Sequence, residues 1–366
     1  MINAASPIIG DKEKKLTAEV LSSKMLASGK YVKDFEAAFA AYCGAKFAIA
    51  NANGTTALHT ALLTAGVKAG DKVITTPFSF IATSNSILFC GAKPIFCDID
   101  PETFNIDPVL LEESLKKEKN VKAVIIVHLY GLPCNMDAIL KLKKKYKFKL
   151  IEDACQAHGA EFKGKKVGSF GDASAFSFYA TKNMTTGEGG ATLTNDASSE
   201  KYARQIINHG RDGHSTFTVL GYNYRMTNIA ASIGIVQLEQ LEGWIKKRIS
   251  NADKYNEAFK DLKFLKTPIV PLHTRHVFHQ YTVRVKPKER ESFMSYLKDN
   301  GVGCGVYYDC VLYNQPFYKK LGYKNGLCPQ AQQAAKEVVS LPVHPSLSKA
   351  DIEKVIKTVL SYKGCL

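Results

Sequence analysis

Helical and strand-like patterns of apolar residues alternate along the first 150 residues. Leu58, Ala61, Leu62 and Ala65 recur at helical spacing, and the apolar run at 72–76 (KVITT) follows a Gly-Asp turn, as a short buried strand would. The same alternation predicts helices at 82–89, 108–118 and 136–146, and strands at 93–98, 123–129 and 148–152. Helices that alternate with almost wholly apolar strands indicate an α/β fold with a mostly parallel sheet covered on both faces.

The pattern changes after a long amphipathic segment at 228–249. A strand is predicted at 279–285 and helices at 289–300 and 331–340, elements that are typical of a smaller α+β domain. We therefore expect a large domain at 1–248 and a small C-terminal domain at 249–366. The pattern leaves open whether the N-terminal residues also pack on the small domain. In a sheet of this kind, the site is expected at the carboxyl ends of the strands.

The composition is typical of a folded protein, and its positive charge favours anionic ligands. Of the 366 residues, 45% are hydrophobic and 23% are charged, which is typical of globular domains. The 49 lysines and arginines outnumber the 34 acidic residues, and this formal charge of +15 favours phosphates or nucleotides as ligands, although a basic surface without a ligand explains it equally well. The lysine-rich run at 140–150 is better explained as the solvated end of a helix followed by a buried strand, so we expect no nucleic-acid partner.

Two further features limit the class of protein. No run approaches the roughly 18 consecutive apolar residues of a membrane span, and the first residues lack a basic segment followed by an apolar run, so we expect a cytoplasmic protein without a membrane partner. Nine cysteines lie scattered without CxxC spacing, as reduced thiols would. A zinc site built from Cys304, Cys310 and Cys328 would match no common ligand spacing, and we expect no metal.

The segment 150–195 holds the residues with the clearest chemistry. Asp153 falls where a buried strand ends, and a carboxylate there can keep the pyridine nitrogen of pyridoxal phosphate (PLP) protonated. Lys182 follows the alternating strand at 173–179 and precedes a glycine-rich turn at 187–190. An amine that leaves a buried strand loses preference for its charged form and can make a Schiff base. Taken singly, Asp153 reads better as a cap or turn residue and Lys182 as a surface lysine.

A second group of residues is suited to a phosphate. Ser177 alternates with Phe176 and Phe178, so its hydroxyl projects to the opposite face of the strand. The sequence NGTT at 53–56 opens a helix, and the free N–H groups and positive end of a helix attract phosphate. Each signal is weak alone, because serine packs under helices and Asn, Gly and Thr also form ordinary caps.

Taken together and in this order, the motifs resemble those of the DegT/StrS-type sugar aminotransferases, a family of fold type I PLP-dependent enzymes. The resemblance covers nearly the whole chain. The matching segments are LASGKYVKDFEAAFAAYCG (26–44), NGTTAL, PFSFIAT, GAKPIFCDID, VHLYG, EDACQAHGA, FSFYATKNMTTGEGG and GYNYRMTNIAASIGIVQLEQLE (221–242).

The resemblance implies a role for particular residues. Lys182 would carry PLP as a Schiff base and act in catalysis with Asp153, which pairs with the pyridine nitrogen. Gln156 would lie beside the ring and its 3-hydroxyl, and Phe80 would stack on the ring. The phosphate would be held by Gly54, Thr55, Thr56 and Ser177. Asn223 would reach the phosphate of the neighbouring subunit's cofactor, which implies a homodimer with shared active sites.

The implied reaction moves an amino group from glutamate to a nucleotide-linked keto sugar and yields an amino sugar nucleotide. The turn TKNMTTGEGG resembles members that aminate C4 of a 4-keto-6-deoxyhexose more than members that act at C3. Alternatives are amination at C3, a PLP-dependent sugar dehydratase, and a PLP-binding regulatory protein without turnover. Relatives that dehydrate lack the Schiff-base lysine, whereas Lys182 is present.

One segment departs from the family pattern. In many relatives the corresponding segment resembles Tyr-Pro-x-Pro-Leu-His. This chain has YDCVLY at 308–313, so both prolines and the histidine are missing. In relatives this segment helps to shape the sugar site. The departure leaves the PLP residues intact but leaves the identity of the sugar open.

Overall fold

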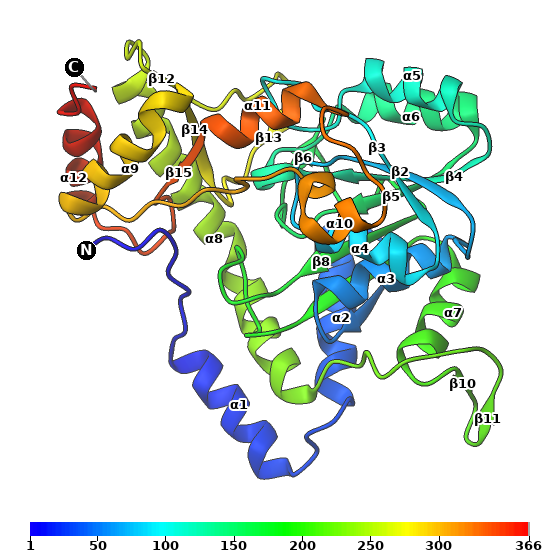
Figure 1. Ribbon diagram of the computed structural model, residues 1–366. Helices are drawn as coiled ribbons and strands as arrows, with labels where there is room; N and C mark the ends of the chain where they lie inside the picture. The colour runs from blue at the N-terminus through cyan, green and yellow to red at the C-terminus, as the bar shows by residue number, and fades with distance from the viewer. Residues whose placement is uncertain (365–366) are drawn as a thin grey trace.

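A computed structural model describes residues 1–364 and places a seven-stranded sheet at the centre of the protein (Figure 1). Along the sheet, the strands lie in the order β1 (Phe47–Asn51), β9 (Gly190–Thr194), β8 (Ala173–Ser177), β5 (Lys149–Asp153), β4 (Val121–Val127), β2 (Lys72–Thr75) and β3 (Lys93–Phe96). Only β9 runs antiparallel to its neighbours, while β8, β5, β4, β2 and β3 pair in parallel. The predicted α/β fold with a mostly parallel sheet is confirmed.

Helices cover both faces of this sheet because both faces are apolar. Val124 and Ile126 of β4 pack in one cluster with α5 and α6, whereas Ala123 and Ile125 pack in another with α3 and α4. Successive residues of a strand point to opposite faces, so a continuous apolar run supplies both clusters. The covering helices are α3 (Gly54–Thr64), α4 (Ala82–Phe89), α5 (Pro108–Lys117) and α6 (Met136–Tyr146).

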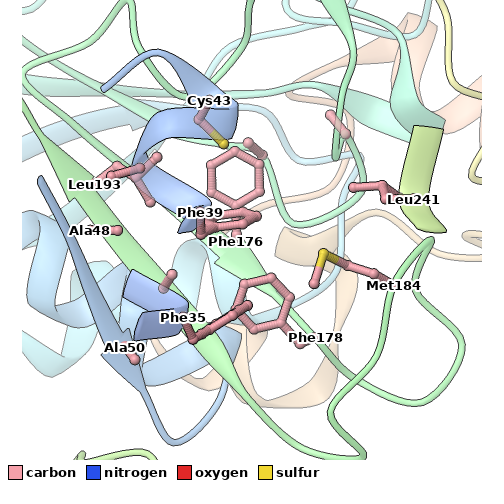
Figure 2. Close-up of a cluster of buried hydrophobic side chains, with 14 of the residues drawn as sticks. Phe35, Phe39, Cys43, Ala48, Ala50, Phe176, Phe178, Met184, Leu193 and Leu241 are labelled. Carbon is pink, nitrogen blue, oxygen red and sulfur yellow. The ribbon is translucent and has the colours of Figure 1, made fainter. Parts of the chain in front are cut away.

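A cluster of aromatic side chains fixes the orientation of β8. Figure 2 shows Phe35 and Phe39 of α2 (Lys30–Cys43) against Phe176 and Phe178. The ring of Phe39 meets those of Phe176 and Phe178 edge-on, at centroid distances of 5.0 and 5.1 Å, a favourable geometry for aromatic pairs. Because both phenylalanines point into this cluster, Ser177 between them points to the other face of β8.

Helix α8 (Asn228–Phe259) is longer than predicted and joins two apolar clusters. Its first part contributes Leu241 to the cluster of Figure 2, and its last part contributes Tyr255 to a cluster with β14. Ile249, which lies between them, touches both clusters. Ile2 also belongs to the second cluster and forms an isolated parallel β-bridge with Val302. The N-terminus therefore packs on C-terminal elements. The division at 248/249 stays a prediction.

The C-terminal elements surround a three-stranded antiparallel sheet. Its order is β12 (Leu265–Lys266), β14 (Tyr281–Val285) and β15 (Val338–Leu341), and it is covered by α9 (Arg290–Asp299) and α12 (Lys349–Leu360). The helix predicted at 331–340 is wrong in its last three residues: α11 (Pro329–Glu337) ends, and β15 begins at Val338. Two β-branched valines, buried beside the free edge of β14, favour strand pairing over another helical turn.

The remaining elements are short or peripheral. They are α1 (Asp11–Ser23), α7 (Ala197–Ile207), α10 (Pro316–Lys320), the 3₁₀ turns at Leu129–Gly131, Pro287–Glu289 and Leu312–Asn314, and the strands β6 (Glu161–Phe162), β7 (Lys165–Lys166), β10 (Arg211–Asp212), β11 (Thr216–Phe217) and β13 (Thr274–Arg275). In residues 1–364, every helix falls short of the length and apolar character that crossing a membrane requires.

Candidate active site

A cavity of about 600 Å³ opens where β5 and β8 end. The large sheet contributes its floor, and the segments around Gln280 and Tyr308 contribute a wall. The predicted site residues that line it are Gly54, Thr55, Phe80, Asp153, Gln156, Ser177 and Lys182. The structure therefore brings together seven predicted side chains or backbone positions from four separate motifs, whereas Thr56 and Asn223 lie outside the lining.

Asp153 is a buried carboxylate held in one orientation. It is the last residue of β5 and is 4% exposed. Its Oδ2 accepts a hydrogen bond of 2.7 Å from the Thr83 hydroxyl, and its Oδ1 accepts one of 3.2 Å from the backbone N–H of Cys155. Sequence reasoning missed Thr83, although it ends the PFSFIAT motif. In residues 1–364 no lysine or arginine forms an ion pair with Asp153, so its charge stays available for a ligand in the cavity.

Lys182 presents an amine without a fixed partner. Its backbone N–H donates to the Tyr179 carbonyl at 2.9 Å, which closes the turn after β8. Within the described chain, its Nζ has neither a hydrogen-bond acceptor nor an ion-pair partner. Burial lowers the pKa of the Lys182 amine below its usual value, while the nearby charge of Asp153 opposes this shift. A larger fraction of the amine is therefore neutral and nucleophilic than in an exposed lysine.

The start of α3 and the end of β8 form a cradle for an anion. Gly54 approaches Ser177 so closely that a Cβ on Gly54 would lie 2.6 Å from the Cβ of Ser177. Thr55 lines the cavity, but the Thr56 hydroxyl donates to the Asn53 carbonyl at 2.8 Å, and the Thr56 N–H donates to the Asn53 side chain at 2.9 Å. Thr56 thus serves the helix cap. Free N–H groups, the helix dipole and the Ser177 hydroxyl suit a phosphate.

The segment at 308–313, which departs from the family pattern, contributes Tyr308 to the cavity wall. Gln156 accepts a hydrogen bond from the backbone N–H of Tyr130 at 2.9 Å and donates to the Tyr308 hydroxyl at 3.0 Å. The Tyr308 ring lies 6.4 Å from that of Phe80, which is 56% exposed and open to the cavity. The end of the segment is different, because Tyr313 is buried in an apolar cluster. Tyr308, which matches the tyrosine of the family pattern, reaches the cavity, whereas the positions that differ from the pattern, Asp309, Val311 and Tyr313, do not line it.

Asn223 lies on the outer surface of its own chain. The backbone around it is tied to the end of α7 by hydrogen bonds from Tyr222 N–H to Ile206 and from Tyr224 N–H to Ile207, of 2.7 and 3.0 Å. Its side chain is exposed. Asn223 therefore lies outside the group of residues that line the cavity of its own chain.

The architecture identifies the class of protein. The structure of S. venezuelae DesV in complex with a ketimine intermediate matches with a TM-score of 0.91 and 31% identity, over 95% of this chain and 93% of that one. This is the fold of the fold type I PLP-dependent aminotransferases, and in this chain Lys182, Asp153 and the start of α3 meet in the cavity at the carboxyl ends of the strands. Solved relatives include a PLP form and a pyridoxamine phosphate form.

The chain belongs to the DegT/DnrJ/EryC1/StrS aminotransferase family, whose sequence profile matches residues 7–360. It is 43% identical over 349 residues to a pleiotropic regulatory protein of Geobacillus stearothermophilus, covering 94% of this chain and 92% of that protein. It is 38% identical over 362 residues to the GDP-perosamine synthase of Caulobacter vibrioides, covering 97% and 96%. Curated relatives differ in the nucleotide-linked sugar they act on. The protein is thus a PLP-dependent sugar aminotransferase. Across residues 1–364, no cluster of side chains could hold a metal ion.

Proposed function

We propose that the protein transfers the amino group of glutamate to C4 of a nucleotide-linked 4-keto-6-deoxyhexose and releases an amino sugar nucleotide. The observation that carries this proposal is the meeting of the Lys182 amine, the Asp153 carboxylate and the N-terminus of α3 in one cavity of about 600 Å³. Pockets of this size accommodate small ligands of several hundred daltons. The surplus positive charge favours a diphosphate-bearing substrate.

Different residues of the cavity would bind different parts of the cofactor. The N–H groups of Gly54 and Thr55 and the Ser177 hydroxyl would hold the cofactor phosphate. Phe80 would stack on the ring and Gln156 would lie beside it. Asp153, fixed by Thr83, would hold a proton at the pyridine nitrogen. With that proton in place, PLP supplies an electron sink for negative charge at the donor α-carbon.

Lys182 performs the proton transfers. Its amine would hold the cofactor until the amino donor takes its place. Because burial lowers the pKa of this amine, it would then be available to accept the proton of the donor α-carbon and to deliver a proton to C4′. The same amine moves a proton in the reverse direction when the keto sugar receives the amino group. Tyr308, which forms the cavity wall beside Gln156, is placed to contact the sugar.

The two half-reactions test this proposal separately. Adding L-glutamate to the purified holoenzyme should convert the yellow cofactor to the pyridoxamine form with release of 2-oxoglutarate. A panel of keto sugar nucleotides should then restore the yellow form with a 4-keto-6-deoxyhexose. Restoration only by a 3-keto sugar would correct the aminated carbon, and loss of a sugar hydroxyl without amine transfer would indicate a dehydratase. An unchanged spectrum with glutamate would favour a regulatory role, which the name of the Geobacillus relative suggests for that protein.

We also propose a homodimer whose cofactor sites are completed by Asn223 of the partner. Support comes from the exposed position of Asn223 and from apolar side chains beside it: Phe217 and Leu220 are 59% and 80% exposed on and after the β10–β11 hairpin, which projects from the body of the protein (Figure 1). Exposed apolar groups gathered in one region are typical of contact surfaces. A cofactor bound by both chains would stabilise the dimer by mass action.

Subunit mixing tests the shared site. Lys182→Ala and Asn223→Ala chains should each be inactive alone, but a mixed dimer has one site with both residues intact. Random exchange makes about half of the dimers mixed, so activity should recover to roughly a quarter of the wild-type value. Mixing Asn223→Ala with the double variant should recover none. Heterodimers without recovery, or full activity of Asn223→Ala alone, would show that the site is not shared through Asn223.

A further inference from the structure

Arg248 is a buried cation without a counter-ion. It lies in the middle of α8 and is 5% exposed. Its Nη1 donates to the carbonyl oxygens of Phe278 and His279 at 3.1 and 3.3 Å, but its Nε has no hydrogen-bond partner. No carboxylate of residues 1–364 forms an ion pair with it. A buried charge in this state is costly unless a ligand pairs with it.

The guanidinium lines a small cavity of about 50 Å³. This cavity shares Thr181, His279, Gln280 and Tyr307 with the large cavity, so the two adjoin beside the residue that precedes Lys182. A volume of roughly 10–15 Å³ suffices for one water molecule, so 50 Å³ has room for a carboxylate group but not for a whole amino acid. The rest of any ligand bound here would extend into the large cavity.

The groups around the small cavity favour an anion. No aspartate or glutamate lines it. His344 is already engaged, because its ring nitrogens face the Ser346 hydroxyl at 2.8 Å and the Asn3 carbonyl at 3.0 Å. Burial lowers the pKa of His279 well below its usual value, and the charges of Lys182 and Arg248 lower it further. Arg248 is therefore the cation of this cavity, and its Nε edge has the planar geometry that binds a carboxylate through two hydrogen bonds.

We propose that Arg248 binds a carboxylate of the amino donor and thereby selects an amino acid as the donor. This inference rests on the proposed aminotransferase reaction and assigns its donor subsite. A carboxylate beside Arg248 would anchor one end of the donor in the small cavity, while the amino group extends toward Lys182 in the large one. The bound carboxylate would also neutralise the buried guanidinium, so the donor is favoured over amines that lack a carboxylate.

The test compares both half-reactions in Arg248→Gln, Arg248→Lys and the control Lys247→Gln, which removes an exposed charge from the same turn of α8. For Arg248→Gln, the second-order rate constant with L-glutamate should fall by about 10- to 100-fold, the worth of a hydrogen-bonded charge. Arg248→Lys should lose less. Oxidation of the pyridoxamine form by the keto sugar should change by less than about threefold in all variants.

Binding of glutarate, an unreactive dicarboxylate, to the holoenzyme provides a readout without turnover. Its affinity should fall by a similar factor in Arg248→Gln and stay unchanged in Lys247→Gln, while unfolding temperature and reducible cofactor content report on folding. L-Alanine, which has only the α-carboxylate, shows which carboxylate of glutamate Arg248 binds. If the rate constant of Arg248→Gln falls with both L-glutamate and L-alanine, Arg248 binds the α-carboxylate. If it falls with L-glutamate alone, Arg248 binds the side-chain carboxylate. Equal losses in both half-reactions, or unaltered glutarate affinity, would overturn the proposal.

Failure of the proposed reaction has a different signature. If wild-type protein binds glutarate through Arg248 but transfers no amino group to any keto sugar, the proposed function is wrong and the carboxylate site stands. If wild-type protein turns over and Arg248→Gln binds glutarate normally, the donor subsite is wrong and the proposed function stands.

Discussion

Lys182→Ala is expected to abolish transamination and the borohydride-reducible link to the cofactor. The loss should reach at least the roughly 10²- to 10⁴-fold that a positioned acid–base group contributes, because the covalent attachment is lost as well. Folding should be retained, since Nζ of Lys182 has no partner in the described structure and its removal leaves no polar group unpaired. Steady-state assays and borohydride reduction followed by mass spectrometry measure these effects.

Two further variants make the Lys182 experiment specific. Lys182→Arg keeps a positive charge in the cavity but cannot form the link, so it should also be inactive. Lys163→Ala removes an exposed lysine and should retain wild-type activity and cofactor content. Cofactor that remains covalently attached in Lys182→Ala would mean that another lysine carries it, and the assignment of this residue would be wrong.

Asp153→Asn is expected to lower kcat by about 10²- to 10³-fold, the range seen when one preorganised electrostatic group is removed from an active site. The amide retains the shape of the side chain and a carbonyl oxygen that can accept from Thr83, but it has no charge to hold a proton on the pyridine nitrogen. The pyridine is then a poorer electron sink. The rate of glutamate-dependent bleaching in single turnover measures this loss directly.

Asp172→Asn is a matched control, because Asp172 immediately precedes β8 and lies beside the start of β5, the strand that Asp153 ends. Asp172 accepts from the Leu150 N–H at 2.8 Å and pairs with Lys143 and Lys149 at 2.9 and 3.2 Å, outside the cavity. Asp172→Asn should lower the free energy of unfolding, because these ion pairs are lost, and should leave the bleaching rate near that of the wild type. Near-normal turnover by Asp153→Asn would show instead that another group protonates the ring.

Local periodicity was sufficient for most of the large sheet. The predicted helices at 82–89 and 136–146 coincide with α4 and α6, and the predicted strands at 72–76 and 148–152 fall on β2 and β5 within about one residue. Strand alternation also placed Ser177 opposite Phe176 and Phe178, and the structure puts Ser177 on the cavity and the phenylalanines in the core. These features depend on neighbours along the chain, which a sequence displays directly.

Features that depend on distant partners were missed or wrong. The strand β15 was predicted as helix because its pairing with β14 lies more than 50 residues away. Nothing in the sequence around Arg248 indicates that this arginine, among 49 basic residues, is buried without a counter-ion.

The sequence by itself determined the α/β class, the aminotransferase family and the lysine and aspartate expected to carry the chemistry, because motifs and periodic patterns are local properties of the chain. The tertiary structure alone decided which side chains share the cavity. It closed Tyr308 against Gln156, anchored Asp153 on Thr83 and enclosed Arg248 in a small cavity that adjoins the large one. Burial and charge pairing arise only when segments far apart in the chain pack together, and they lower the pKa of Lys182 and leave Arg248 buried without a counter-ion in the described structure.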